Sequence, residues 1–337
     1  MLNIHRARGT LFSGALAATL ALAATATATV IAAPVPPADA QPGAAAAAAQ
    51  APPVPLLWKV SDEDNSLYLL GSFHLLLPTD YPLSRDVDMA FADAEKLVFE
   101  IAPDELASPQ LGLQMARAAM RTDGSTLDDE LGPELAAKLA AWGSDNAAQL
   151  AATGLTVEVL QRFEPWFVGM MVTISQMTGL GFDPAIGLDA HMGGLAEAAQ
   201  KPVAGLETGA LQIAFLDGMD TGEQLQMLEQ ALEQAEAGAE QMLALHGAWR
   251  AGDTQAIIDG TIAEMRREFP ALYQVINVAR NDAWVPKLEA RLREDGSDDS
   301  LVVVGAMHLL GEDGVVEKLR AKGYAVERVC SACADTR

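Results

Sequence analysis

The stretch LLGSFHLL at residues 69–76 is the most informative part of this sequence, because its pattern returns as VVGAMHLL at residues 303–310, near the opposite end of the chain. Both copies are an apolar run that leads into Gly-x-x-His and then Leu-Leu. An apolar run of this kind predicts a strand, and the glycine permits a turn or a close approach of the backbone. Open α/β sheets place ligands just beyond their strand ends. The two copies therefore predict two half-sites, around His74 and His308, that folding brings together.

A single Gly-x-x-His motif also suits a hydrogen-bonded histidine in a turn. Two copies are more informative, because they contain two of the four histidines that lie in the expected folded body. Of the other two, His246 follows Met242 by one helical turn, which predicts a partly buried histidine at the edge of an amphipathic helix. His191 follows the segment 187–190 in a loop or a helix start, and the sequence leaves its role open.

Short apolar runs that predict strands gather at the two ends of the chain. Residues 56–60 and 66–70 flank a polar turn and predict a hairpin, and residues 96–101 form the next run. Residues 301–304 and 324–329 supply strands at the other end. The sequence therefore predicts an α/β (α+β) fold with one central mixed sheet, built from both chain ends and flanked by helices.

The middle of the chain is predicted to be a large helical insertion. Apolar residues recur at helical spacing through residues 108–199, with the methionines of this region expected in the core. Residues 201–206 predict a short buried strand. One further apolar face at residues 225–242 predicts a helix, and two more helices are expected at residues 254–267 and 271–293.

Two acidic residues end predicted strands, Glu100 after residues 97–99 and Glu207 after residues 203–206. A carboxylate just beyond an apolar strand is costly unless it is solvated, paired or bound to a metal, and simple solvation is the plain alternative. If the strands are parallel, these glutamates and the two motif histidines meet at one edge of the sheet. Two histidines with one or two carboxylates suit Zn²⁺, Mn²⁺ or Co²⁺ with an open position for water, whose pKa the metal would lower.

Arg280 lies inside an apolar helical stripe, with Ile276 one turn before it and Trp284 one turn after. A charge in such a place needs a partner. The guanidinium is suited to clamp a substrate carboxylate or to steady an oxyanion. A structural ion pair or a snorkelling arginine is the alternative.

The first 55 residues predict an export signal followed by a linker. A basic start, a long apolar run and an Ala-x-Ala site at residues 38–40 predict a secretory signal peptide at residues 1–40. A signal anchor is the alternative, because the run is long enough to span a bilayer. The Ala/Pro-rich residues 41–55 predict a linker. We therefore expect an exported, periplasmic domain at residues 56–329, with no stable membrane span once the signal is cleaved.

Residues 330–337 form a tail that contains the only two cysteines, Cys330 and Cys333. In an oxidising compartment the pair can close a local disulfide. The strand-to-helix context of a thioredoxin-like motif is absent, and a metal site needs more ligands than these two. The sequence assigns the tail no function.

Charge and missing motifs exclude several classes of protein. The formal net charge is −24, from 46 acidic and 22 basic residues, and such a surface repels phosphate backbones, which excludes nucleic acid as an expected partner. There is no His-Glu-x-x-His, Gly-x-Ser-x-Gly, Walker or Gly-x-Gly-x-x-Gly motif. The commonest zinc-peptidase, serine-hydrolase, NTPase and dehydrogenase classes are therefore excluded.

Six sequence blocks, in order, resemble the TraB/GumN family, which is related to the Tiki proteins and more distantly to the erythromycin-esterase/ChaN-like group. The resemblance covers nearly all of the expected domain, and Ser72 stands where relatives often have Thr, which leaves the motif intact. The blocks are LYLLGSFH (67–74), LVFE (97–100), GLD (187–189), KPVAGLET (201–208), RNDAW (280–284) and VGAMHLLGEDG (304–314).

The resemblance implies a central mixed sheet flanked by helices and a metalloprotease-like site that uses both motif histidines, a glutamate and an arginine. On this chain these fall on His74, His308, Glu100 and Arg280. Tiki relatives are regarded as Mn²⁺- or Co²⁺-dependent proteases. The expected function is therefore an exported metal-dependent hydrolase, a peptidase, acting on a peptide or small-molecule substrate.

In that site the two motif histidines bind the metal, Glu100 binds it or acts as general base, and Arg280 stabilises charge on the substrate. Glu207, Asp189 and His191 are expected as supporting groups around them. Two alternatives stay open: a non-catalytic protein that binds metal or haem or sequesters peptides, and an esterase acting on a small molecule.

Overall fold

The computed structural model describes residues 50–294 and 296–333. The expected signal peptide at residues 1–40 and the first part of the linker at residues 41–55 lie outside the described residues. No helix within the described ranges is both long and apolar enough to cross a membrane.

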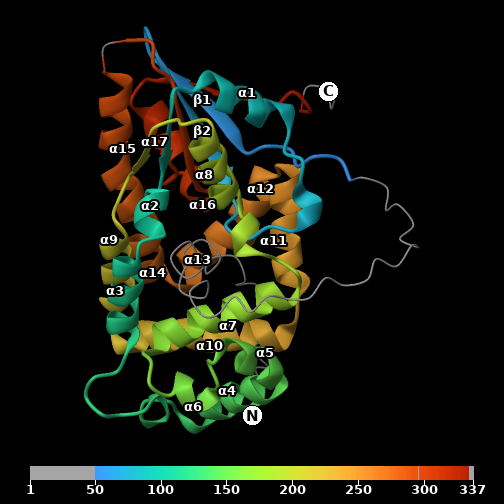
Figure 1. Cartoon of the computed structure of the whole chain (residues 1–337), viewed down its shortest axis with the longest axis vertical. Coiled ribbons are helices and arrows are strands. Elements are labelled where there is room, and N and C mark those ends of the chain that lie inside the picture. The colour runs from blue at the N-terminus through green and yellow to red at the C-terminus, as the bar shows by residue number, and fades with distance from the viewer. Residues whose placement is uncertain (1–49, 295, 334–337) are drawn as a thin grey trace, which may run out of the picture.

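A six-stranded mixed sheet forms one end of the molecule, in the order β4-β3-β5-β2-β1-β6 (Figure 1). The strands β2, β5, β3 and β4 are parallel, and β1 runs antiparallel to its neighbours β2 and β6. The sheet therefore joins both ends of the chain around a helical middle, as predicted. Its strands are β1 (Leu57–Ser61), β2 (Ser66–Ser72), β3 (Lys96–Phe99), β4 (Val203–Gly205), β5 (Ser300–Gly305) and β6 (Ala325–Arg328).

The central pair of the sheet is β2 and β5, and every residue in both strands is buried. Strands covered on both faces carry continuous apolar runs rather than an alternating pattern. Their register pairs Leu70 with Val303 and Ser72 with Gly305. The two Gly-x-x-His motifs therefore leave the sheet side by side, at the same edge.

Helices cover the sheet and build the other end of the molecule. In Figure 1, α4, α5, α6, α7 and α10 gather at the end opposite the sheet, and α7 packs along α10. The α-helices are α1 (Arg85–Asp93), α2 (Pro103–Leu106), α3 (Pro109–Ala119), α4 (Pro133–Asp145), α5 (Ala147–Thr153), α6 (Val157–Leu160), α7 (Pro165–Gly179), α8 (Leu188–Ala198), α9 (Gly209–Asp217), α10 (Thr221–Ala237), α11 (Glu240–Ala251), α12 (Thr254–Ile257), α13 (Ala263–Glu268), α14 (Pro270–Tyr273), α15 (Ala279–Leu292), α16 (Ala306–Leu309) and α17 (Val315–Ala321).

Short helical turns of other kinds join these helices. The 3₁₀ turns are η2 (Pro78–Asp80), η3 (Leu127–Asp129) and η4 (Pro184–Ile186). Two π-helical turns, η5 (Ile258–Ile262) and η6 (Gln274–Val278), interrupt the predicted helices at residues 254–267 and 271–293. Such π-turns are rare and occur frequently at functional sites, and η6 ends two residues before Arg280.

Three sequence predictions are wrong in detail. The segment 201–206 is not a buried strand, because β4 lies at the edge of the sheet and Val203 is 38% exposed. The helix predicted at 225–242 is two helices, separated at Gly238, whose φ of 92° ends α10. His246 is buried rather than partly exposed, because its Nε2 lies 2.9 Å from Asp80 Oδ2, a partner far away in the sequence.

The two cysteines of the tail are joined to each other. Cys330 and Cys333 form a disulfide directly after β6. Nearby, the backbone amide and hydroxyl of Ser331 both donate hydrogen bonds to Asp86 Oδ2 at the start of α1. The tail is thereby attached to the start of α1.

Candidate active site

Five side chains from distant parts of the chain meet beyond the C-terminal ends of the parallel strands. His74, Glu100, Glu207 and His308 follow β2, β3, β4 and β5, and Arg280 reaches them from α15. None of the five residues is more than 8% exposed. The structure thus brings together the two motif histidines, both strand-end glutamates and the arginine of the predicted site.

The Arg280 guanidinium lies at the centre of this cluster. Its Nη2 donates to Glu100 Oε2 at 2.5 Å and to Glu207 Oε1 at 2.6 Å, and its Nη1 lies 3.0 Å from His308 Nε2. Nη1 also donates to the carbonyl oxygen of Ile276, inside the π-turn η6, at 3.2 Å. The buried charge therefore has a partner on every side, as a buried cation requires.

Glu207 serves as the anchor for Arg280. Its carboxylate accepts from Arg280 Nε at 3.0 Å, from Trp284 Nε1 at 2.9 Å and from Gln212 Nε2 at 2.8 Å. Gln212 Nε2 also lies 3.2 Å from Glu100 Oε2 and so bridges the two glutamates. The Trp284 ring stacks against the guanidinium, 4.8 Å from its central carbon. These contacts leave Arg280 little freedom to move away from Glu207.

The charges of the cluster follow from these contacts. Burial would raise the pKa of Glu100, but Arg280 and the neighbouring histidines outweigh it and lower that pKa to about 2. Burial would lower the pKa of Arg280, but Glu100 and Glu207 outweigh it and raise that pKa. Burial and the nearby Arg280 lower the pKa of His308 to about 3. At neutral pH the cluster thus contains a neutral His308 beside a guanidinium flanked by two carboxylates.

His308 is held on both nitrogens. Its Nδ1 lies 2.8 Å from Asn281 Oδ1, and its Nε2 faces Arg280 Nη1. Asn281 is fully buried, and its Nδ2 donates to the carbonyl oxygen of Asp313 at 2.8 Å. The ring also packs on Trp284, with centroids 4.5 Å apart. The imidazole is therefore fixed in position by the helix that carries Arg280.

His74 is held differently, by a carboxylate from α8. Its Nδ1 lies 2.7 Å from Asp189 Oδ2, and the Ser72 hydroxyl donates to the same oxygen. The Nε2 of His74 lies 3.9 Å from Glu100 Oε1, on the side of the cluster. The sequence block GLD at 187–189 thus supplies the partner of the first motif histidine.

A close backbone contact explains the glycine in that block. A Cβ on Gly187 would lie 1.9 Å from the carbonyl oxygen of His74, a distance that no real side chain adopts. Next to it, Leu188 N donates to the carbonyl oxygen of Phe73 at 3.1 Å. Glycine at 187 lets α8 begin directly against the first motif, and this approach delivers Asp189 to His74.

Three possible metal ligands surround the small space directly in front of Gly305 that a Cβ on residue 305 would occupy. A Cβ on Gly305 would lie 3.2 Å from Glu100 Oε1, 3.3 Å from His74 Nε2 and 3.6 Å from His308 Cδ2. The Glu100 oxygen also accepts from Gly305 N at 2.7 Å. The absence of a side chain at residue 305 therefore keeps open the point on which both motif histidines and Glu100 converge.

The donor types at this space fit a divalent metal ion. Two imidazoles and a carboxylate are ligands that Zn²⁺, Mn²⁺ and Co²⁺ accept, and two carboxylates against one guanidinium leave a net negative charge to attract a cation. As the side chains now lie, no group of three or more His, Cys, Asp and Glu in the described ranges is arranged to hold a metal. In this arrangement His308 Nε2 faces Arg280 Nη1. A metal bound through His308 Nε2 would therefore require that this contact opens.

His191 is the predicted site residue that the structure leaves apart from the cluster. Its ring packs on Tyr81, with centroids 4.6 Å apart, on a face of α8 different from that of Asp189. Burial lowers the pKa of His191, and Asp88 is the charged group that acts on it. Its contacts are those of a histidine packed between α1 and α8.

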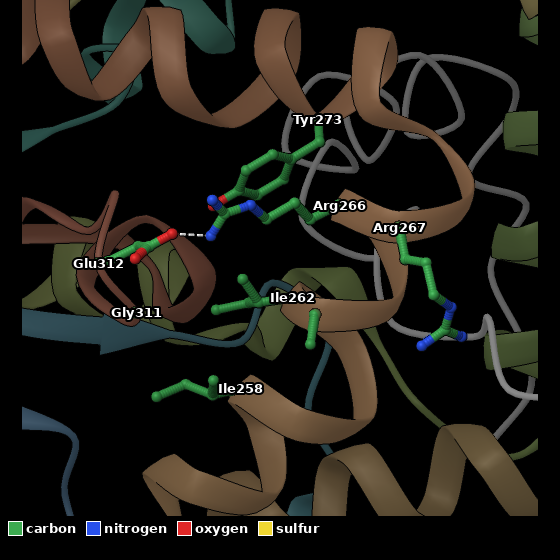
Figure 2. A pocket seen from close by; sticks show the side chains of 8 residues that line it. Ile258, Ile262, Arg266, Arg267, Tyr273, Gly311 and Glu312 are labelled. Atoms are coloured by element: carbon green, nitrogen blue, oxygen red, sulfur yellow. Dashed lines mark hydrogen bonds and ion pairs between the residues drawn. The ribbon is translucent and has the colours of Figure 1, made fainter.

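A separate surface cavity lies beside the end of the second motif. Its volume is about 540 Å³, and none of the five clustered side chains lines it. Figure 2 shows Arg266 paired with Glu312 across it, while Ile258 and Ile262 form an apolar wall. Its lining residues are Ile258, Ile262, Ala263, Arg266, Arg267, Tyr273, Gly311 and Glu312. Arg266 is paired with Glu312 and Arg267 with Glu268, so this cavity offers no chemistry to rival the cluster.

Sequence reasoning missed several residues that support the cluster. Ser72, Asn281 and Trp284 stand inside the sequence blocks that carry the family resemblance, and Asn281 follows Arg280 directly. Their place in those blocks was a signal that could have found them. Gln212 lies in α9 outside every block, and no local pattern in the sequence marks it.

Comparison with known proteins gives a family and distant relatives. A sequence model described as the TraB/PrgY/gumN family matches residues 56–328. The chain is 24% identical over 316 residues to "Metalloprotease TIKI1" of Danio rerio, an alignment that covers 80% of this chain and 62% of that protein. It is also 24% identical over 254 residues to the uncharacterized protein YbaP of Escherichia coli strain K12, covering 75% of this chain and 87% of YbaP. No solved structure matches the chain.

Proposed function

The chain belongs to the TraB/PrgY/gumN family, and we propose that it is an exported, metal-dependent hydrolase that cleaves peptides. One observation carries the proposal: His74 Nε2 and Glu100 Oε1 border the same space in front of Gly305, which His308 also lines. A buried guanidinium adjoins that space. Export rests on the signal-peptide pattern of residues 1–40.

The residues that would hold a divalent ion are His74, His308 and Glu100. In such a site the ion acidifies a water molecule and polarises the carbonyl group of the substrate. Glu100 is ionised well below neutral pH, because Arg280 lowers its pKa to about 2. It is therefore ionised and available as a ligand at neutral pH, whereas so low a pKa makes it a weak base toward water.

Arg280 would change its role as His308 engages the ion. Its Nε and Nη2 are committed to Glu207 and Glu100. Its Nη1 donates one hydrogen bond to His308 Nε2 and so occupies the lone pair that a metal would take. Once that acceptor is lost, the Nη1–H is left to donate to a substrate oxygen on which negative charge develops. Glu207 keeps the guanidinium in place throughout.

A peptide is the proposed substrate because of the relative from Danio rerio, which is named a metalloprotease. The chain spans 62% of the length of that relative, so the activity of the whole relative comes to this chain only as a proposal. The cluster itself suits hydrolysis of any activated carbonyl compound, and an ester is the competing substrate class.

The test measures metal content and peptide hydrolysis together. Purified without chelators, the protein should hold close to one Mn, Co or Zn ion per chain by elemental analysis, and a His74→Ala/His308→Ala double variant should hold none. Peptide-library cleavage should fall at least about 10³-fold in the variant, because the nucleophile is lost. A His191→Ala variant is the matched control and should keep both metal and activity. Equal metal content and equal cleavage in all three proteins contradict the proposal.

The near-complete burial of the cluster favours one second candidate, a non-catalytic protein that binds metal or haem or sequesters peptides. None of the five residues is more than 8% exposed, which suits a closed site better than an open one. Stoichiometric metal that depends on both histidines, without cleavage of any peptide or ester library, would support this candidate over the hydrolase.

A further inference from the structure

We propose that Asp189 and Asn281 are positioning residues that hold His74 and His308 in one and the same tautomer, with the hydrogen on Nδ1 and the lone pair on Nε2. The inference deepens the proposed function, because it explains how His74 presents the lone pair of Nε2 toward Gly305 and how His308 presents that of its Nε2 toward Arg280. It does not depend on hydrolysis, since a tautomer is measured in the metal-free protein.

On the His308 side, the amide of Asn281 is oriented by its own partners. Asn281 Nδ2 lies 2.7 Å from Asn277 Oδ1 and 2.8 Å from the carbonyl oxygen of Asp313, and both partners are acceptors. Asn277 is oriented in turn, because its Nδ2 donates to the carbonyl oxygen of Met307. The amide of Asn281 therefore turns its oxygen to His308 Nδ1, which must carry the hydrogen.

Arg280 fixes the other nitrogen of His308 independently. A guanidinium has five N–H donors and no acceptor. Its Nη1 lies 3.0 Å from His308 Nε2, so that nitrogen has to offer its lone pair. Both contacts of the ring thus demand the same tautomer, and neither is satisfied by the opposite one.

On the His74 side, the oxygen comes from a carboxylate, which only accepts hydrogen bonds when ionised. Asp189 Oδ2 lies 2.7 Å from Nδ1, so Nδ1 must donate. The Ser72 hydroxyl donates to the same oxygen and so helps to aim it. The close approach of Gly187 to the backbone of His74 sets the distance from which Asp189 reaches the ring.

The two positioning residues matter because of where Nε2 lies. His74 Nε2 is 3.3 Å from the position of a Cβ on Gly305, inside the space that Glu100 and His308 also line. An Nε2–H tautomer would aim a hydrogen at that space in place of a lone pair. Partners that orient metal-binding histidines typically contribute 10- to 100-fold to metal affinity.

The experiment is ¹⁵N NMR of the histidine side chains of the full chain, freed of metal by a chelator, at pH 7.5. Protonated and unprotonated imidazole nitrogens resonate far apart, and His74→Gln and His308→Gln variants assign the signals. Both histidines are expected with Nδ1 protonated and Nε2 unprotonated. In Asp189→Ala only His74 should move to the other tautomer, and in Asn281→Ala only His308. Each histidine is thus the control for the other.

An Nε2–H tautomer in either wild-type histidine overturns the proposal, and so does a doubly protonated His74 at this pH. Unchanged tautomers in the folded variants overturn the assigned roles. If Asn281→Ala does not fold, the spectra of the wild type and of the Asp189→Ala variant still test the proposal. A Co²⁺ titration followed by absorbance should show about 10- to 100-fold weaker binding in each variant. If the wild type binds no Co²⁺ at all, the metal-dependent function fails while the tautomer result stands.

Discussion

The two Gly-x-x-His copies share a sequence pattern but differ in local structure. After β2 the first copy bends at His74 and Leu75, and Leu76 then pairs through its backbone with Asp183. After β5 the second copy turns at once into α16, with His308 in its only turn. The common pattern therefore sets where each histidine leaves the sheet. The segment that packs on each copy sets its conformation afterwards.

The same difference extends to charge. His74 has an anionic partner, Asp189, whereas His308 has a neutral one, Asn281, and a cation, Arg280. Burial and that cation lower the pKa of His308 to about 3. Two halves with one motif thus carry unequal electrostatics.

Removing Arg280 should have the largest effect, because it contacts the His308 half and both glutamates directly. Arg280→Met leaves two buried carboxylates without their cation, and breaking such a pair costs about 3–5 kcal/mol. Urea unfolding monitored by circular dichroism measures the loss. The control is Arg266→Met, an arginine whose side chain is 53% exposed, where an exposed pair contributes at most about 1 kcal/mol. If both variants lost the same free energy of unfolding, Arg280 would stabilise the protein no more than an exposed arginine does.

Gly187→Ala should perturb the surroundings of His74 and leave those of His308 unchanged. The added Cβ would meet the carbonyl oxygen of His74 at 1.9 Å, so backbone must shift, at a cost near the upper end of about 1–3 kcal/mol. The control is Gly194→Ala on the same helix, where nothing lies within 4 Å of the new Cβ and stability should be unchanged or rise by about 0.5–1 kcal/mol. In NMR spectra, the His74 ring signals should move and those of His308 should stay.

Lowering the pH should reduce the stability that the neutral His308 contributes. The pKa of His308 falls from its ordinary 6.5 to about 3 on folding, so the unfolded chain binds a proton between these values while the folded chain does not. The stability from this group is therefore present above about pH 6.5 and is lost as the pH falls toward 3. The stability gap between wild type and His308→Gln should shrink by about 3 kcal/mol from pH 7.5 to pH 4.5. A constant gap would show that His308 does not stay neutral.

Gly305→Ala should have the smallest effect on stability and yet affect both halves. The new Cβ would crowd Glu100 Oε1 at 3.2 Å and His74 Nε2 at 3.3 Å, contacts that relax by small shifts at a cost of about 1 kcal/mol. It would occupy the point on which the ligands converge. Metal content should therefore drop strongly while urea unfolding hardly changes. Retained metal would place the ion elsewhere.

The sequence predicted the sheet and the clustered residues because both depend on patterns that are local. Apolar runs fix β2 and β5, and a residue that follows such a run lies at the sheet edge whatever the rest of the chain does. The place of Arg280 in an apolar helical stripe, between Ile276 and Trp284, marked it as a buried cation, and the family resemblance then added it to the site. These features could be predicted from residues that are neighbours along the chain.

What the sequence could not predict are partners brought together by packing alone. Gln212 bridges Glu100 and Glu207 from α9 with no motif around it. His246 looked like a helix-edge residue, yet Asp80 lies against it from a distant turn. The strand β4 has an apolar sequence but lies at the edge of the sheet, because strand order is a tertiary property.

Because both chain ends join in one sheet, the order of synthesis determines when the sheet can be completed. The second motif lies on β5, the last strand but one, and it pairs in parallel with β2 near the beginning of the domain. A ribosome makes about 5–20 residues each second, so the early strand waits for its neighbour while the whole helical middle is made. Arg280 on α15 is made before β5, but His308 follows β5 and is made last of the five. The cluster around His74, Glu100 and Glu207 can therefore be completed only when the end of the domain has been made.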